Sequence, residues 1–99
     1  MLHIVNQSHT QTSALSCCLR FALPGQALLL TEDAVYAATA AAAEASGIAA
    51  AAARLKVYAL QPDLAARGVG ARLATGVTAI DYAGFVDLVA GHPTNQSWL

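Results

Sequence analysis

Four short apolar runs constrain the fold of this chain more than any other feature of its sequence. They are LHIVN at 2–6, QALLLT at 26–31, KVYAL at 56–60 and GVTAID at 76–81. Runs that are apolar throughout, rather than alternating, are typical of strands buried on both faces of a parallel sheet. At least 15 residues separate consecutive runs, which is enough for a crossover helix. The pattern predicts an α/β fold: a small three-layer domain with a mainly parallel central sheet of four to five strands and helices on both faces.

Helix signals occur in the segments between the runs. Thr12 or Ser13 can cap a helix that continues to about Ala22. In QPDLAARG, Pro62 suits the first position of a short helix, and Gly68 suits the residue after its end. These two connections therefore follow the strand–helix–strand pattern.

The longest connection, 32–55, is rich in alanine. Its first residues, Glu32 and Asp33, favour the positive end of a helix dipole. Residues 37–54 are low in complexity and high in helix propensity. We expect Ser46 and Gly47 to end one helix there, with a less regular segment after it.

The C-terminal part contains one more helix signal. Asp81 can cap a helix over 82–91, which has three apolar residues at helical spacing: Phe85, Leu88 and Val89. The last segment, HPTNQSWL, is interpreted as a tail. We expect its Trp98 to anchor against the core of this chain or against a neighbouring chain.

Composition limits the classes of function. The 99 residues fit a single domain, 1–99, with 57% hydrophobic and only 11% charged residues, against about a quarter charged in typical domains. Much of the exterior is then apolar, which favours a subunit of a larger assembly and allows homo-oligomers of the isolated chain. The alternative is that abundant alanine inflates the count. Five scattered Lys and Arg residues, at net charge −1, argue against direct nucleic-acid binding.

Targeting signals are not visible in this sequence. The start, MLHIVNQSHT, lacks the basic and long apolar regions of a signal peptide. Residues 34–53 are uncharged except for Glu44, but alanine is too weakly apolar for us to expect a membrane span. The only two cysteines are neighbours, which is unlike a disulfide framework. We expect a reducing, cytoplasmic location.

The cysteines, Cys17 and Cys18, are the first candidates for chemistry. On a helical wheel, Cys18 lies in the middle of an apolar face with Leu15 and Ala22, while Cys17 lies at its edge. A cysteine in apolar surroundings has a raised pKa and is inert. The pattern alone therefore favours a core role for Cys18.

Other candidate groups are weaker. His3, His9 and His92 are too far apart in sequence to indicate a metal site. Glu32 and Asp33 follow a predicted strand, and ligands gather at the carboxyl ends of parallel strands, but a solvated helix start is the favoured explanation for them. No glycine-rich phosphate motif is present, so we expect neither a nucleotide cofactor nor a metal.

Six pieces of the chain together resemble a known family. MLHIVNQS, SCCLRFALPG, LLLTEDAVYAA, KVYALQPDLAARG, IDYAGFVDLVAGHP and QSW occur in the order found in the DsrH/TusB family of sulfur-relay proteins. The resemblance covers nearly the whole chain and is weakest over 39–54 and around Leu73. It implies a DsrE-like α/β fold.

The resemblance also implies partners and a role. In this family the subunit assembles in the cytoplasm with DsrE/TusD-like and DsrF/TusC-like proteins, as a heterohexamer with two copies of each. The complex passes persulfide sulfur to a TusE/DsrC-like acceptor. One branch leads to 2-thiouridine at the tRNA wobble position, and the other serves dissimilatory sulfur oxidation. No residue separates the branches, and we favour tRNA thiolation on generality.

The same resemblance bears on one residue. Cys18, in CCLRF, falls where the DsrH branch has a cysteine, which makes it a candidate accessory persulfide acceptor. Nothing is carried onto Cys17, and the principal sulfur-carrying cysteine of the family lies on the DsrE/TusD-like subunit. Three alternatives stay open: a purely structural subunit without thiol chemistry, an independent small-molecule-binding domain, and a stand-alone enzyme.

Overall fold

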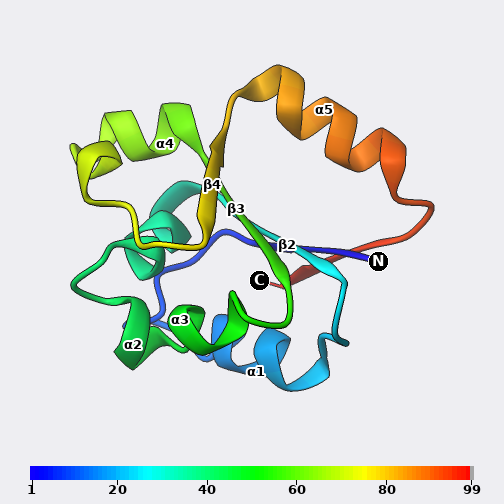
Figure 1. Ribbon diagram of the computed structural model, residues 1–99, viewed down its shortest axis with the longest axis horizontal. Helices are drawn as coiled ribbons and strands as arrows, with labels where there is room; N and C mark the ends of the chain where they lie inside the picture. Colours follow the sequence, from blue (N-terminus) through cyan, green and yellow to red (C-terminus); the bar gives the residue numbers. More distant parts are fainter. Residues whose placement is uncertain (99) are drawn as a thin grey trace.

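The computed structural model describes residues 1–98, and these form an α/β domain with a five-stranded, fully parallel sheet in the order β4-β3-β2-β1-β5 (Figure 1). The strands are β1 (Leu2–Val5), β2 (Ala27–Leu30), β3 (Lys56–Leu60), β4 (Val77–Ile80) and β5 (Asn95–Trp98). The α-helices are α1 (Ala14–Phe21), α2 (Ala43–Ser46), α3 (Ile48–Ala51), α4 (Gln61–Ala66) and α5 (Tyr82–Gly91). Two 3-10 helices are η1 (Glu32–Ala38) and η2 (Gly70–Arg72). The predicted fold class is confirmed.

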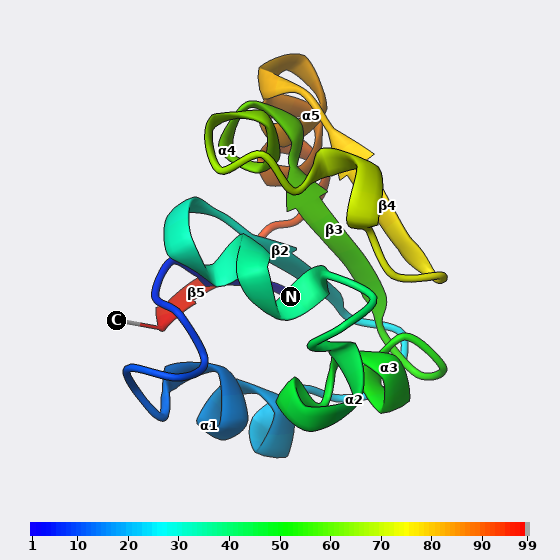
Figure 2. The same ribbon diagram turned by 90° about the vertical axis from the view of Figure 1, so that its left-hand side faces the viewer.

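The strand order determines which helices share a face of the sheet. The chain steps in one direction from β1 to β4 and then returns across the whole sheet to β5. Because crossover connections are right-handed, steps in one direction leave their helices on one face, and the return leaves its helix on the other. Figure 2 shows this arrangement, with α1, α2 and α3 on one side of the sheet and α5 on the other.

The larger core lies between the sheet and the α1 side. Buried residues from α1, η1, α2, α3 and α4 pack on alternate residues of the strands, with Leu28 and Leu30 of β2 at the centre. Helices α1, α3 and α4 each contribute a residue that is at most 1% exposed: Leu15, Ile48 and Leu64. This face is covered over the central strands β1, β2 and β3.

The smaller core lies under α5. It consists of the fully buried Leu2, Ala27 and Leu29, with half-buried residues packed around it: Ile4, Tyr58, Ile80, Phe85 and Leu88. Of the three α5 residues predicted at helical spacing, Phe85 and Leu88 belong to this core, whereas Val89 is 38% exposed. Asp81 caps α5 as predicted, accepting a hydrogen bond from the Gly84 N–H at 2.8 Å.

The alanine-rich connection contains a helix that ends at Ser46 and Gly47, as predicted, but that helix is short and the rest of the connection is not one continuous helix. The chain forms η1, becomes extended at Thr39, and then forms only two short helices separated by Gly47. The reason is tertiary: Thr39 pairs with Leu73 in an antiparallel bridge, which takes backbone groups away from a helix. Gly47 has φ +89, and a Cβ there would lie 2.9 Å from Leu19, so the break also suits close packing on α1.

The segment predicted as a tail is a strand. β5 pairs in parallel with β1, and its Trp98 packs against the larger core, which confirms the anchor predicted for that residue. Asn95, Gln96 and Ser97 have no strand signal of their own, because polar residues such as these are depleted in strands. Hydrogen bonds to a distant strand therefore decide this element.

Two smaller differences concern the start of α1 and the exposure of β4. Ser13 is the residue before α1, but its side chain makes no capping hydrogen bond, and Thr12 Oγ1 instead accepts from the Ala14 N–H at 3.3 Å. The predicted fourth buried strand, β4, is an edge strand whose residues Thr78 and Ala79 are exposed. None of the helices in residues 1–98 is long and apolar enough to cross a membrane.

Candidate functional site

Cys18 lies inside the larger core. Its side chain is 0% exposed and packs among residues of α1 that include Ala14 and Leu15. The neighbouring Cys17 is half-buried, and both thiols are free. The predicted wheel positions, buried for Cys18 and at the edge for Cys17, agree with the structure.

The environment of Cys18 disfavours the thiolate. Burial raises the pKa of the Cys18 thiol from 9.0 to about 12, and the positive charge of Arg54 opposes this rise only in part. The Arg54 guanidinium is occupied at the end of α1, where Nη2 donates to Leu19 O at 2.6 Å and Nη1 to Ala22 O at 2.9 Å. In this conformation Cys18 is a neutral core residue.

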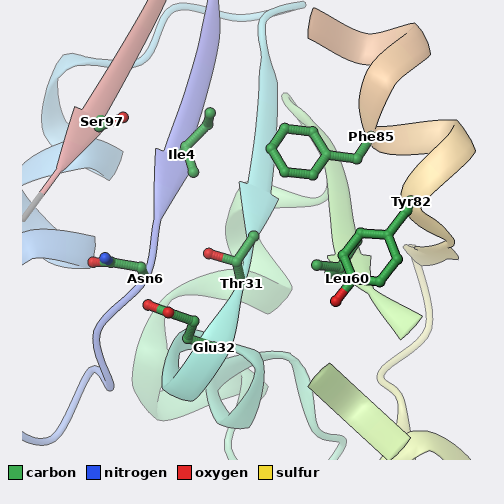
Figure 3. A pocket seen from close by; sticks show the side chains of 8 residues that line it. All are labelled: Ile4, Asn6, Thr31, Glu32, Leu60, Tyr82, Phe85 and Ser97. Atoms are coloured by element: carbon green, nitrogen blue, oxygen red, sulfur yellow. The ribbon is translucent and has the colours of Figure 1, made fainter. Parts of the chain in front are cut away.

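A cleft of about 360 Å³ opens on the other face of the sheet, at the carboxyl ends of the strands (Figure 3). Strands β1, β2, β3 and β5, or the residues that follow them, meet the start of α5 here. Its lining combines polar and apolar side chains: Ile4, Asn6, Thr31, Glu32, Leu60, Tyr82, Phe85 and Ser97. This is the position where parallel α/β sheets commonly bind ligands.

Glu32 adopts a strained backbone conformation at the mouth of this cleft. Its φ is +50, which is uncommon for a residue other than glycine. The Glu32 N–H donates to Asp63 Oδ2 at 2.7 Å, so α4 holds this turn in place. Arg67 Nε in turn donates a hydrogen bond to Asp33 Oδ1 at 2.9 Å, and Arg67 Nη1 lies 3.8 Å from Asp63 Oδ1.

The acidic groups near the cleft therefore differ in their state of charge pairing. Asp33 and Asp63 share the Arg67 guanidinium, whereas Glu32 forms no ion pair with any residue from 1 to 98. Asn6 adds a buried Oδ1 atom without a hydrogen-bond partner among the same residues. Thr31 Oγ1 makes a long hydrogen bond, 3.4 Å, to Val5 O. The polar side of the cleft therefore carries one carboxylate, that of Glu32, and no basic side chain among its described lining residues.

The cleft has the mixed polar and apolar lining of a ligand-binding site. Within residues 1–98, its lining includes neither cysteine nor histidine. Cys18 lies on the opposite face of the sheet. The structure therefore separates the candidate thiol from the candidate cleft.

Two of the three histidines, His3 and His92, make hydrogen bonds within the fold, whereas the buried Nδ1 of His9 has no partner within residues 1–98. His3 is buried, donates through Nε2 to Gln26 Oε1 at 2.7 Å and accepts at Nδ1 from the Trp98 indole N–H at 3.2 Å. His92 Nδ1 donates to Leu88 O at 2.7 Å. Within the described part of the chain, no group of three His, Cys, Asp or Glu side chains is placed to hold a metal ion.

One flank of α5, next to the cleft, is a second notable surface. Five apolar residues, which we call the α5 stripe, follow one side of this helix: Tyr82, Phe85, Val86, Val89 and Ala90. The last four line an apolar groove of about 300 Å³, and the first two also line the cleft. The stripe and the cleft thus form one continuous surface.

Sequence reasoning identified part of this site. Glu32 does line a cleft at the carboxyl ends of the strands, whereas Asp33 faces Arg67. It missed Asn6, Tyr82 and Ser97, which come from loops, from a helix start and from the unpredicted β5. The strand alternation of LHIVN could have indicated Ile4, because residues two apart share a face of a sheet.

Comparison with known proteins gives one consistent result. The family model described as "DsrH like protein" matches residues 7–95. The chain is similar to Protein TusB of Escherichia coli strain K12, with 36% identity over 98 residues, which is 99% of this chain and 100% of that protein. It is likewise similar to Protein TusB of Serratia proteamaculans strain 568, with 37% identity over the same shares.

Proposed function

The chain belongs to the DsrH family, and from this premise we propose that it is a subunit of a cytoplasmic sulfur-relay complex that passes persulfide sulfur toward 2-thiouridine at the tRNA wobble position. Its main contribution is to complete the complex. The proposed partners are DsrE/TusD-like and DsrF/TusC-like subunits in a heterohexamer, with a TusE/DsrC-like protein as the sulfur acceptor.

The observation that carries this proposal is similarity over the full length to curated proteins named TusB. The similarity spans every strand and helix described above, so it concerns a whole subunit. The TusB name also favours the tRNA branch over the sulfur-oxidation branch, which the residues alone did not separate.

The surface of the chain supports a role in completing a complex. Helix α5 contains no buried residue, and its Tyr82 and Val86 side chains are 61% and 65% exposed. Contiguous exposed apolar surface of this kind marks a protein–protein interface. A chain with 11% charged residues has few groups with which to solvate that surface.

The accessory acceptor role of Cys18 stays a hypothesis. A persulfide acceptor needs access to the donor and thiolate character, and burial in the larger core opposes both. The hypothesis therefore requires α1 to move away from the sheet in the complex. A subunit role that needs neither cysteine requires no such movement.

Deletion of the gene, followed by quantification of tRNA nucleosides by mass spectrometry, tests the proposed function. We expect 2-thiouridine to fall when the chain is absent and to return when the wild-type chain is supplied. Unchanged 2-thiouridine together with impaired sulfur oxidation would instead identify the other branch.

A Cys17→Ser/Cys18→Ala variant separates a scaffolding role from an acceptor role. If the chain only completes the complex, this variant restores 2-thiouridine as well as the wild type does. Failure to restore it, with the complex intact and a persulfide of 32 additional mass units on Cys18 of the wild type, would establish the acceptor role.

A further inference from the structure

We propose that the α5 stripe and the adjoining cleft bind a basic, apolar segment of a partner subunit, with a Lys or Arg side chain of that segment entering the cleft toward Glu32. This inference rests on the proposed function, because the partner is another subunit of the relay complex. Beyond the proposed function, it names the surface of this chain that binds the partner and the kind of side chain that this surface recognises.

The first support is the incomplete cover of the α5 face. Residues 75–98, which include β4, α5 and β5, contain no buried residue. Helix α5 alone lies over this face among the described residues, and the surrounding Ile4, Tyr58 and Ile80 stay half-exposed. A segment packed beside α5 would bury this apolar area, as the helices of the α1 side do on the opposite face.

The second support is the charge around the stripe. Residues 73–99 contain two carboxylates, Asp81 and Asp87, and neither Lys nor Arg. Asp81 is engaged as the helix cap, whereas Asp87 is exposed and forms no ion pair within residues 1–98. Complementary charge at the rim of an interface guides association, so the matching surface is basic.

This charge distribution also argues against a second copy of this chain as the occupant. Two copies related by a two-fold axis would present the same patch to each other. The unpaired carboxylates near this face, Glu32 and Asp87, would then be brought toward those of the second copy, and like charges repel. A different subunit that carries Lys or Arg avoids this repulsion.

The third support is the construction of the cleft. Tyr82 and Phe85 supply apolar and aromatic walls, and Glu32 supplies a carboxylate that has no partner within residues 1–98. A Lys or Arg side chain has a matching form, since its stem packs on apolar groups while its charged end pairs with a carboxylate. The orphaned Asn6 Oδ1 is a further acceptor in the lining.

Co-expression with the two proposed sister subunits, followed by purification and kinetic binding measurements, tests this surface. The variants are Val86→Asp for the stripe and Glu32→Gln and Asp87→Asn for the charges. Two exposed residues on the α1 side provide matched controls: Ala49→Asp and Glu44→Gln. Circular dichroism and thermal unfolding of each purified variant confirm that it folds.

We expect Val86→Asp to raise the dissociation rate about tenfold or more, because it places a charge in the buried centre of the contact. Glu32→Gln and Asp87→Asn should slow association a few-fold and flatten its dependence on ionic strength. The controls should leave both rates unchanged.

The outcomes separate this inference from the proposed function. If the wild-type chain does not bind the sister subunits, the proposed function fails and the inference fails with it. If it binds and folded Val86→Asp binds equally well, the inference alone is overturned. If neutralising Glu32 and Asp87 leaves the salt dependence unchanged or speeds association, the partner segment is not basic and the inference is likewise overturned.

Discussion

Cys17 and Cys18 are adjacent in sequence, but they occupy different environments. Successive residues of a helix differ in direction by about 100°, so Cys18 enters the core while Cys17 lies half-buried at its edge. Residue type identified both as candidates for sulfur chemistry. Burial decides which of them a reagent, or a persulfide donor, can reach.

Alkylation at pH 8 should therefore select Cys17 in the folded chain. With its pKa at about 12 instead of 9.0, Cys18 has about a thousandfold less thiolate at this pH, and it is also shielded from the reagent. Iodoacetamide treatment with peptide mass mapping measures the two rates, and a denatured sample provides the control in which both residues react. Equal labelling of both cysteines in the native chain would show that α1 opens readily.

The raised pKa of Cys18 also predicts a dependence of stability on pH. Folding favours the neutral thiol, so this contribution is fully present below pH 9, the ordinary pKa, and declines as the pH rises toward 12. Cys18→Ala should lower the free energy of unfolding at pH 8, and the difference from the wild type should shrink at pH 10 to 11. Denaturant titrations at both pH values measure it. A difference that grows with pH would contradict the burial argument.

At the scale of elements, one contact distant in sequence and one local contact satisfy the backbone groups at helix ends. The guanidinium of Arg54, from the segment before β3, satisfies carbonyl groups at the C-terminal end of α1. Asp81 satisfies an N–H at the start of α5. The Arg54 contact connects α1 to a segment distant in sequence, and the Asp81 contact stabilises the first turn of α5.

Arg54→Ala should lower the free energy of unfolding by about 1 kcal/mol, because two carbonyls of α1 lose a charged donor at a partly solvated site. Arg20→Ala is the control, since Arg20 is an exposed arginine of α1 without a hydrogen-bonding role among the described residues. Chemical denaturation of both variants checks this. If the Arg54→Ala and Arg20→Ala variants are equally stable, the hydrogen bonds of Arg54 do not stabilise α1.

Asp81→Ala should also lower the free energy of unfolding, by about 1 kcal/mol, through loss of the N-cap. Hydrogen exchange should rise most in α5, while Asp81→Asn should retain most of the protection because an amide oxygen still accepts the hydrogen bond. Uniform loss of protection across the sheet would show instead that α5 does not open separately.

At the scale of the whole molecule, the two faces of the sheet are unequally covered. The α1 side packs several elements on the strands, whereas α5 alone covers the other face within residues 1–98. An apolar stripe along one flank of that single cover leaves contiguous apolar surface exposed. Uncovered apolar surface of this kind is what we expect of a subunit in the proposed assembly.

The isolated chain should self-associate weakly as its concentration rises, because this apolar surface is exposed to water when the partners are absent, while the like charges near it disfavour a tight two-fold dimer. Val86→Asp should reduce the association, and Ala49→Asp should not. Sedimentation velocity over a range of concentrations measures it. If the chain stays a single monomeric species throughout that range, its exposed apolar surface does not need to be covered by another chain.

Local patterns in the sequence were sufficient for the fold class, for four of the strands and for the cap of α5. Apolar runs, helix caps and glycine positions are properties of neighbouring residues, so they can be recognised without knowing the rest of the chain. Tertiary structure decided the remainder. The polar β5 becomes a strand through backbone hydrogen bonds to β1, and the alanine-rich connection breaks where Thr39 pairs with Leu73. The cleft also depends on the return of the chain across the sheet, which places α5 beside the ends of β1 and β2. These features are contacts between distant segments, and their energies come from burial and pairing that no local pattern encodes.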